Sequence, residues 1–378
     1  MKRIYLDHNA STPIAPVVAD VMRTALSEGY GNPSSLHWAG TPARTLVDEA
    51  RLKVASLLGC HSDEIIFTSG GSEANNMALK GAFFASDKEH RQIITTAVEH
   101  PAIVEPCRFL ERLGATITWL SVDQFGRVDP DDLGRAITDD TILISVMQAN
   151  NEVGTIQPIQ ECAVIAQAYG IPFHTDAAQS VGKIETKVDT LGVDMLSIAG
   201  HKIYAPKGVG ALYMRRGIQI EPFMHGAGHE SGRRAGTESA VLDAALGAAC
   251  ELVSDLSPMA QVRSLRDHFW ERLHGCFGNR VALNGHPELR LPNTLNVSFV
   301  GQDGAALLSS LYGVAASTGS ACHEGNVELS PILEAMGISE TVGMGAIRFS
   351  LGRNTSVDEL DIVVEKVAAS LSVNAPVS

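Results

Sequence analysis

Two ionisable residues, Lys202 and Asp176, each lie at the end of an apolar run typical of a buried strand. A lysine in a partly buried crevice has a lowered pKa, which favours its covalent attachment to a carbonyl compound. A nearby aspartate can keep a pyridinium nitrogen protonated, so that a pyridoxal ring acts as an electron sink. These two residues alone are equally compatible with a solvated surface lysine and a helix N-cap aspartate.

The stretch from Ser69 to Glu73, Ser-Gly-Gly-Ser-Glu, opens a predicted helix directly after a strand. Backbone N–H groups and the helix dipole make such a turn a cradle for a phosphate group. The stretch lacks the Gly-Lys-Ser/Thr of a nucleotide P-loop and the spacing of G-x-G-x-x-G, so nucleotide binding is disfavoured. An ordinary glycine-rich turn fits these residues as well as a phosphate site does.

Cys322 differs in its surroundings from the other five cysteines, which are scattered without a C-x-x-C pair. It lies in a small, polar, glycine-containing stretch, residues 316–326, which we expect to be a mobile loop. A thiol there would be accessible, as a reactive cysteine must be, although an unreactive surface cysteine fits too. Arg348 interrupts an apolar strand pattern, so we expect it to meet a carboxylate of either a structural partner or a substrate.

The histidines offer weaker signals. His100 follows a predicted strand, where it can stack on a flat ring or move protons near neutral pH, or simply be a satisfied polar residue. His225 and His229 have the i, i+4 spacing of a metal pair, but two glycines between them disfavour the helix that such a pair needs. We therefore expect no metal site.

The elements that position these residues follow from the apolar periodicity. Helical patterns such as 101–113 and 159–169 alternate with strand candidates, which predicts an α/β fold with a mainly parallel, mixed sheet. The last two strand candidates are joined only by a loop, which allows an antiparallel pair there. The strand candidates are residues 65–68, 92–96, 116–121, 142–147, 171–175, 195–198 and 210–214.

Ligands of such sheets gather beyond the carboxyl ends of the strands. Five successive strand ends of this chain carry polar or ionisable side chains, and polar turns explain one such end more easily than five. The predicted site therefore lies at this edge. The segments that follow the strands are residues 69–73, 99–100, 148–151, 175–179 and 199–202.

The length of 378 residues is more than one hydrophobic core usually serves. We predict a large domain of residues 15–256. A smaller α+β domain would contain residues 1–14 and 257–378, with strand candidates at 294–300 and 347–351 and with the Cys322 stretch.

Composition limits the partners. A formal net charge of −14 argues against direct binding of nucleic acid and favours a basic protein partner. No run approaches the roughly 18 apolar residues of a membrane span. Asp7 and His8 stand where a signal peptide would be apolar, so we expect a cytoplasmic protein.

The motifs, taken in order, resemble those of the NifS/IscS-type cysteine desulfurases, which are fold-type I pyridoxal-phosphate enzymes related to class V aminotransferases. The resemblance runs over essentially the whole chain, and the motifs are more specific in this order than singly. They are Tyr-Leu-Asp-His-Asn-Ala-Ser-Thr-Pro (5–13), Gly-Asn-Pro-Ser-Ser (31–35), Asn-Asn-Glu-Val-Gly (150–154), His-Lys-Ile-Tyr-Ala-Pro-Lys-Gly (201–208) and Ile-Arg-Phe-Ser-Leu-Gly (347–352).

The resemblance implies conversion of L-cysteine to L-alanine by a homodimer with pyridoxal 5'-phosphate. Lys202 would hold the cofactor and then move the substrate's α-proton, and Cys322 would take the sulfur as a persulfide. The other implied cofactor contacts are Asp176 to the pyridine nitrogen, Gln179 to the ring hydroxyl, His100 on the ring face, Gly71, Ser72 and His201 to the phosphate, and Thr237 across from the second subunit. Asn151 and Arg348 would bind the substrate carboxylate. The stretch around Cys322 resembles the group with a long catalytic loop.

Three departures from the family pattern stand out. Ala199 replaces a serine that would bond to the phosphate, which predicts weaker cofactor retention, and His229 replaces a common glutamine. The short, uncharged ending from Ser370 to Ser378 leads us to expect a sulfur-acceptor protein of a dedicated thiolation or iron–sulfur pathway rather than the housekeeping scaffold. Selenocysteine lyase and other class V lyases or aminotransferases remain alternatives, although an aminotransferase needs no loop cysteine.

Overall fold

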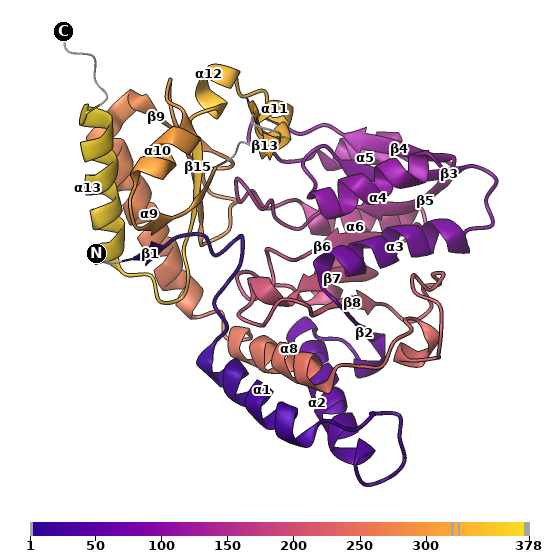
Figure 1. Ribbon diagram of the computed structural model, residues 1–378. Coiled ribbons are helices and arrows are strands. Elements are labelled where there is room, and N and C mark those ends of the chain that lie inside the picture. The colour runs from indigo at the N-terminus through magenta and orange to yellow at the C-terminus, as the bar shows by residue number, and fades with distance from the viewer. Residues whose placement is uncertain (1–2, 319–320, 324–325, 374–378) are drawn as a thin grey trace.

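The computed structural model describes residues 3–318, 321–323 and 326–373 (Figure 1). It is built around a seven-stranded mixed sheet whose strands are buried apart from the edge strand β4, which explains why most of them are rich in apolar residues. The strand order is β2-β8-β7-β6-β5-β3-β4, and the strands are β2 (Ile65–Thr68), β3 (Arg91–Thr96), β4 (Ala115–Leu120), β5 (Thr141–Ser145), β6 (Phe173–Asp176), β7 (Met195–Ala199) and β8 (Gly210–Met214).

The predicted α/β fold and the antiparallel pair are confirmed. β8 runs antiparallel to both of its neighbours, β2 and β7, whereas β3 to β7 pair in parallel. The ends of each predicted strand lie within about two residues of the ends of an observed strand. Strand ends are the least certain part of any assignment, so this difference is expected.

Helices cover both faces of this sheet. α3 (Gly71–Ala85) and α4 (Pro101–Glu111) pack on one face, and α6 (Ile159–Ala168) with α7 (Val188–Leu191) on the other, where the core extends to α1 (Pro16–Glu28), α2 (Gly40–Leu58) and α8 (Ala240–Val253). α2 and α8 approach closely because Gly247 has no side chain: a Cβ there would lie 2.7 Å from the Cα of Ala50. α5 (Pro130–Ala136) lies between β4 and β5 in the chain.

A second hydrophobic core lies beside the first, at the left of Figure 1. Its antiparallel sheet has the order β12-β15-β10-β9, and β1 (Ile4–Tyr5) pairs with β11 (Val314–Ala315). The elements in this part of the chain are α9 (Pro258–Phe277), β9 (Val281–Asn284), β10 (Thr294–Phe299), α10 (Gly304–Ser310), β12 (Ser317–Thr318), α11 (Pro331–Ala335), α12 (Glu340–Gly343), β15 (Ala346–Ser350) and α13 (Val357–Val373). Ile332 and Leu333 of α11 pack in a separate small cluster with Val98 and Val153.

The change from one core to the other falls between the end of α8 at Val253 and the start of α9 at Pro258. The N-terminal strand β1 belongs with the second core, since Ile4 and Leu6 pack there. These observations support our division into residues 15–256 and residues 1–14 with 257–378, which we keep as a proposal. Among the described residues, no helix has the length and apolar character needed to cross a membrane.

The expectation of a loop over residues 316–326 was wrong for the described part of this stretch. β12 pairs antiparallel with β15, and β13 (Ala321–His323) forms a hairpin with β14 (Asn326–Glu328), in which Cys322 is opposite Val327. Small polar residues predict a loop only on average, and backbone pairing with a neighbouring strand overrides that preference. The side chain of Cys322 lies outside the described residues.

Candidate active site

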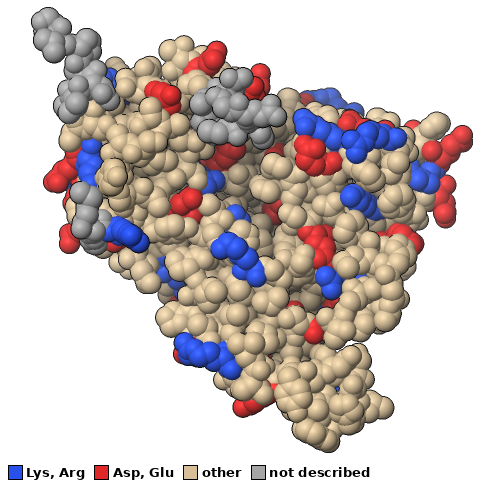
Figure 2. Space-filling view, viewed as in Figure 1, with Lys and Arg blue, Asp and Glu red and all other residues tan. Residues whose placement is uncertain are grey.

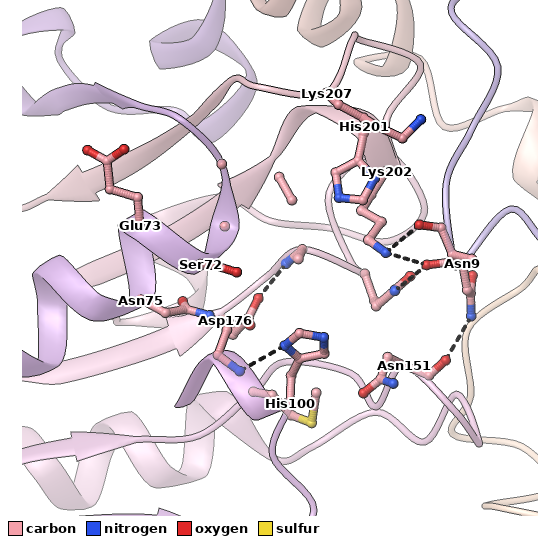
Figure 3. Close-up of a pocket in the computed structure, with 18 of the residues that line it drawn as sticks. Asn9, Ser72, Glu73, Asn75, His100, Asn151, Asp176, His201, Lys202 and Lys207 are labelled. Atoms are coloured by element: carbon pink, nitrogen blue, oxygen red, sulfur yellow. Dashed lines mark hydrogen bonds between the residues drawn. The ribbon is translucent and has the colours of Figure 1, made fainter. Parts of the chain in front are cut away.

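A cavity of about 570 Å³ lies between the sheet's carboxyl edge and the second core, where Figure 2 shows a hollow in the surface. It brings together the predicted site residues other than Cys322 and Thr237 (Figure 3). Those residues are Gly71, Ser72, His100, Asn151, Asp176, Gln179, His201, Lys202 and Arg348. The strand ends therefore converge as the sheet topology predicts.

Lys202 lies in the single turn η2 (Gly200–Lys202) that follows β7. Its Nζ donates hydrogen bonds to the backbone carbonyls of Asn9, at 2.6 Å, and Ala10, at 2.8 Å (Figure 3). Burial lowers the pKa of Lys202 to about 8; the positive charge of Arg348 lowers it further, while Asp176 and Asp7 oppose the shift. The amine is therefore more easily deprotonated than that of a solvated lysine, as Schiff-base chemistry requires.

Asp176 ends β6 and is only 5% exposed. Its Oδ1 accepts a hydrogen bond from the backbone N–H of Ala178 at 2.9 Å, and its Oδ2 accepts one from Asn75 Nδ2 at 2.7 Å. Asn75 lies one turn into α3, and sequence reasoning missed it because a polar residue on a helix gives no sign of its distant partner. Together these donors fix the carboxylate at the wall of the cavity.

The phosphate cradle forms where α3 begins. The N-cap residue Gly70 has φ 151°, a conformation that other residues rarely adopt. A Cβ on Gly71 would lie 3.2 Å from the Cβ of Ala199, so a side chain there would crowd the opposite wall. Gly71 and Ser72 line the cavity, and the first-turn N–H groups of a helix have no partner within the helix, so those of α3 are available to an anion.

His201 lies across from this turn, beside Lys207 in Figure 3. Its Nδ1 is buried without a hydrogen-bond partner. Burial lowers the pKa of His201 to about 4, helped by the nearby charges of Lys202 and Lys207, so the ring is neutral at pH 7. An unpaired polar nitrogen opposite a helix N-terminus is the arrangement expected if a phosphate completes the site.

His100 is both a structural cap and a wall of the cavity. Its Nδ1 accepts a hydrogen bond from the backbone N–H of Ala102 at 3.0 Å, which caps α4. In the neutral ring, the proton must therefore be on Nε2. Burial lowers the pKa of His100, an effect that Asp176 opposes and Lys202 reinforces, so a neutral imidazole faces the cavity. His100 can therefore be a hydrogen-bonded polar residue that caps α4 and still present its ring to a ligand in the cavity.

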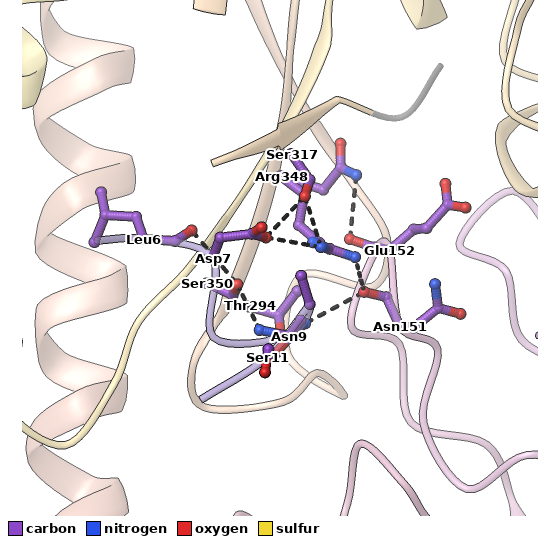
Figure 4. Close-up of polar contacts among 12 residues, drawn as sticks. Leu6, Asp7, Asn9, Ser11, Asn151, Glu152, Thr294, Ser317, Arg348 and Ser350 are labelled. Carbon is purple, nitrogen blue, oxygen red and sulfur yellow. Dashed lines mark hydrogen bonds and ion pairs between the residues drawn. The ribbon is translucent and has the colours of Figure 1, made fainter. Parts of the chain in front are cut away.

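Arg348 projects from β15 and meets a structural carboxylate (Figure 4). One NH2 group bonds to Asp7 Oδ1 at 2.9 Å and to Ser317 Oγ at 3.0 Å, and NH1 bonds to the Asn151 carbonyl at 3.0 Å. Arg348 Nε and Asn151 Oδ1 are buried without partners. Both residues line the cavity, so each has polar capacity left for a ligand.

Asn9 joins the two walls of the site and was not singled out from the sequence. Its carbonyl accepts from Gln179 Nε2 at 3.0 Å as well as from Lys202. Its side chain bonds to Thr294 Oγ1 at 2.8 Å and to the Asn151 carbonyl at 3.2 Å. These partners are more than a hundred residues away in the chain, so only the family motif 5–13 marked the position.

Lys183 was missed as well. Its Nζ donates to Gln179 Oε1 at 2.9 Å and to Asn9 Oδ1 at 3.4 Å. An ammonium group has no acceptor, so the oxygen of the Gln179 amide must face Lys183, and its nitrogen faces Asn9. Burial lowers the pKa of Lys183 to about 7, and the charges of Lys202 and Arg348 add to this effect.

Two predicted site residues, Thr237 and Cys322, are not among the described residues that line the cavity, for different reasons. Thr237 is exposed and does not line the cavity of its own chain, which leaves a contact with a second subunit to be tested. Cys322 cannot be placed by its side chain. Three other cysteines (Cys107, Cys162 and Cys250) are buried, and burial raises the pKa of Cys162 and of Cys250 to about 12.

Within the part of the chain that the structure describes, no three histidine, cysteine, aspartate or glutamate side chains gather as metal ligands. His225, one of the two histidines with metal-like spacing, is exposed and pairs with Glu221 at 3.2 Å.

Comparisons with known proteins agree with this geometry. Residues 4–363 match the model of the family Aminotransferase class-V. The chain belongs to this family. It is 48% identical to "Cysteine desulfurase IscS" of Dictyoglomus turgidum, over 100% of this chain and 97% of that protein. These comparisons confirm the predicted relationship to NifS/IscS-type cysteine desulfurases.

Solved structures of similar proteins support the same assignment. A "NifS-like protein" superposes with a TM-score of 0.92 at 36% identity, covering 98% of this chain and all of that chain. A structure titled "SspA in complex with cysteine" superposes with a TM-score of 0.84 at 35% identity, covering 93% of this chain and all of that one.

The family is that of a pyridoxal-phosphate enzyme, as predicted, and the residues of the cavity fit the cofactor. The Lys202 amine, the Asp176 carboxylate and the neutral His100 ring suit its aldehyde, ring nitrogen and ring face, respectively. The cradle at Gly71 and Ser72, with the unpaired His201 Nδ1, suits its phosphate. Ala199 lines the cavity and offers no hydroxyl there.

Proposed function

We propose that this protein converts L-cysteine to L-alanine and holds the removed sulfur as a persulfide on Cys322. The observation that carries the proposal is the Lys202 amine, whose pKa is lowered to about 8, in one cavity with Asp176 and Arg348. Pyridoxal phosphate supplies an electron sink that weakens the bonds to the substrate's α-carbon. Other class V activities use the same three residues and have no need for a nucleophilic cysteine.

Lys202 acts as the acid–base group on the substrate's α-carbon. Its free amine lies beside the carbonyls of Asn9 and Ala10, and with a pKa of about 8 it can accept or return a proton near neutral pH. Asp176, held by Asn75 and Ala178, would pair with the ring nitrogen of the cofactor and stabilise a proton there.

Arg348 and Asn151 bind the carboxylate of the substrate. The guanidinium is already oriented by Asp7, Ser317 and the Asn151 carbonyl, so little side-chain freedom is lost on binding. Arg348 and Asn151 both line the cavity. The unpaired Arg348 Nε can donate to a carboxylate, as can the Asn151 NH2 group, whereas the unpaired Asn151 Oδ1 can only accept.

Cys322 receives the sulfur. Its thiolate attacks the substrate sulfur, so that an S–S bond forms and the Cβ–S bond breaks. The electron pair of the broken bond stays with the substrate carbon, which takes up a proton and leaves as alanine. The persulfide sulfur then passes to an acceptor protein, for which we retain a dedicated thiolation or iron–sulfur pathway as a proposal.

We also propose a cytoplasmic homodimer in which Thr237 of each subunit reaches the phosphate of the other. The exposed position of Thr237, outside the cavity of its own chain, supports this arrangement. Mixed dimers test it directly: a Thr237→Ala chain paired with a Lys202→Ala chain leaves one intact cofactor site only if Thr237 acts on the site of the other subunit, and leaves none if it acts in its own subunit.

The reaction is tested by incubating the holoenzyme with L-cysteine, L-selenocysteine, or an amino donor plus a keto acid. We expect alanine from cysteine in an amount equal to the sulfane sulfur formed. Rapid amino-group transfer to the keto acid, without alanine from cysteine, would show an aminotransferase. Turnover of selenocysteine but not cysteine would show a selenocysteine lyase.

A further inference from the structure

The phosphate cradle at the start of α3 also contains a carboxylate, that of Glu73. Because two negative charges repel each other, this carboxylate must be neutralised if the turn is to bind an anion. Glu73 lies on the first turn of α3 and lines the same cavity as Gly71 and Ser72. Its Oε2 accepts a hydrogen bond from the backbone N–H of Ser69 at 2.7 Å, so the carboxylate is held at the helix N-terminus. In Figure 3, Ser72 points into the cavity, whereas the Glu73 carboxylate points away from Lys202.

Arg234 neutralises this carboxylate. Its Nε lies 2.8 Å from Glu73 Oε1 and its NH2 lies 3.2 Å from Glu73 Oε2, which makes a two-pronged ion pair. The side chains of Arg234 and Glu73 are 19% and 8% exposed, respectively, so water screens the pair little. Although burial raises the pKa of Glu73, its bonds with Arg234 and Ser69 outweigh this effect and lower the pKa, so the carboxylate is charged.

The segment that carries Arg234 is itself fixed. Glu230, close before Arg234, forms a two-pronged pair with Arg51 at 2.7 Å and accepts from the backbone N–H of Phe67 on β2. Arg233 donates to the carbonyl of Asp63, at 2.8 Å. Arg234 therefore approaches the cradle from a segment that two neighbouring residues anchor to the start of the sheet.

We propose that Arg234 is a positioning residue for the cofactor's phosphate. It cancels the charge of Glu73 and keeps that carboxylate on the Ser69 N–H, so that the first-turn N–H groups of α3 remain free for the phosphate. If Arg234 were removed, a buried carboxylate would face a dianionic group across the same turn. The inference concerns cofactor binding alone and does not depend on the sulfur chemistry.

The test is equilibrium titration of the full-length, cofactor-freed chain with pyridoxal phosphate and with pyridoxal, which lacks the phosphate. The variants are Arg234→Met, Glu73→Gln and the double variant. We expect Arg234→Met to weaken pyridoxal phosphate binding roughly tenfold or more, the range for loss of a charged hydrogen-bonded pair. Pyridoxal binding should change less than about twofold, and the double variant should recover most of the lost affinity for pyridoxal phosphate, because the unpaired charge is gone.

Arg216→Met is the matched control. Arg216 makes an equally two-pronged pair with Asp63, at 2.9 and 2.7 Å, and does not line the cavity. It should leave both affinities unchanged. Should Arg234→Met fail to fold, Arg234→Gln, which removes the charge but keeps a polar side chain, takes its place and should show the same loss. Arg234→Lys, which keeps the charge, should then bind pyridoxal phosphate nearly as the wild type does.

Three results would overturn the proposal. One is unchanged affinity for pyridoxal phosphate in Arg234→Met. Another is an equal loss for pyridoxal, which would show a general structural role. The third is a double variant that binds pyridoxal phosphate as weakly as Arg234→Met does, because the effect of Arg234 would then not depend on the charge of Glu73.

Discussion

The two walls of the active-site cavity are built differently. On the cofactor wall, Asp176 and His100 follow strands of one sheet, and each bonds to a backbone N–H two residues away. On the substrate wall, Arg348 pairs with Asp7, 341 residues away, and Asn9 bonds to the Asn151 carbonyl, 142 residues away. Local contacts thus orient Asp176 and His100, and the longer bond from Asn75 to Asp176 lies within the large core. The substrate wall instead depends on bonds from Arg348 and Asn9 to Asn151 that join the two cores.

This difference implies a division of labour. Changes in the cofactor wall should affect the chemical step or cofactor retention, and changes in the substrate wall should mainly affect substrate binding. Asn9 connects the two walls, because its carbonyl bonds to Lys202 and its side chain to Thr294. The predictions below test this division, from the largest expected effect to the smallest.

Lys202→Ala should abolish turnover, because the covalent attachment of the cofactor and the main proton carrier are lost together. The expected loss in kcat is at least ~100-fold, the low end for a single acid–base group. Steady-state alanine production measures it. Lys183→Ala is the matched control: this lysine is buried near the same site, hydrogen-bonds to Gln179 and Asn9 and does not line the cavity, so its variant should keep measurable turnover. More than about one per cent activity in Lys202→Ala would contradict its role.

Arg348→Lys should raise the KM for cysteine by roughly 10- to 100-fold, since a point charge replaces a fork of donors worth ~1.5–3 kcal/mol. The spectrum of the bound cofactor should not change. Arg353→Lys serves as a comparison, because Arg353 donates to the carbonyls of Leu252 and Asp255 and lies outside the cavity. Equal kcat/KM values in wild type and Arg348→Lys would assign Arg348 a purely structural pairing with Asp7.

The pH dependence of cofactor loading tests the environment of Lys202. Attachment requires the neutral amine, so the loading rate of the cofactor-freed chain should fall up to tenfold per pH unit below about 8 and level off above that value. Because Arg348 contributes to the lowered pKa, Arg348→Met should move the midpoint to higher pH. Stopped-flow absorbance follows the reaction. A midpoint near 10 in the wild type would contradict the buried setting.

Ala199→Ser should slow cofactor loss on dialysis by up to roughly tenfold, through one added hydrogen bond to a charged group. Ala199 is in place for this, since its Cβ lies 3.2 Å from where a Cβ on Gly71 would be. Ala102→Ser, on the His100 side of the same cavity, is the control and should not change retention. Unchanged or faster loss in Ala199→Ser would show that the hydroxyl does not reach the phosphate.

The difference between short-range and long-range contacts also explains which features of the fold and the site could be predicted from the sequence. The sheet, its antiparallel pair and the convergence of Lys202, Asp176 and His100 follow from apolar periodicity and from the carboxyl ends of strands, which are local signals. Arg348 could be predicted to meet a carboxylate, but not that the carboxylate is Asp7, because nothing in either segment specifies the other.

The site residues that the sequence analysis did not identify also have partners far away in the chain. Asn9, Asn75 and Lys183 are ordinary polar residues until folding places Lys202, Asp176 and Gln179 beside them. The stretch around Cys322 was misjudged for a related reason: β12 forms by pairing with β15, and that pairing depends on a strand whose residues lie about 30 positions later. The composition of a segment indicates its intrinsic preference for loop, strand or helix, but it does not show which distant strand the segment will pair with.

The central claim is that Cys322 accepts sulfur activated on the cofactor wall. Cys322→Ser should still bind pyridoxal phosphate and change its absorption on addition of cysteine, yet form no persulfide, because a hydroxyl cannot take up sulfur. Cys276→Ser is the matched control, since Cys276 is the cysteine that the structure shows exposed, and it should form persulfide as the wild type does. Mass spectrometry of thiol-labelled protein after incubation with cysteine decides the matter. The account predicts a mass gain of one sulfur on the Cys322 peptide, absent in Cys322→Ser; a persulfide on any other cysteine, or undiminished sulfur transfer in Cys322→Ser, would contradict it.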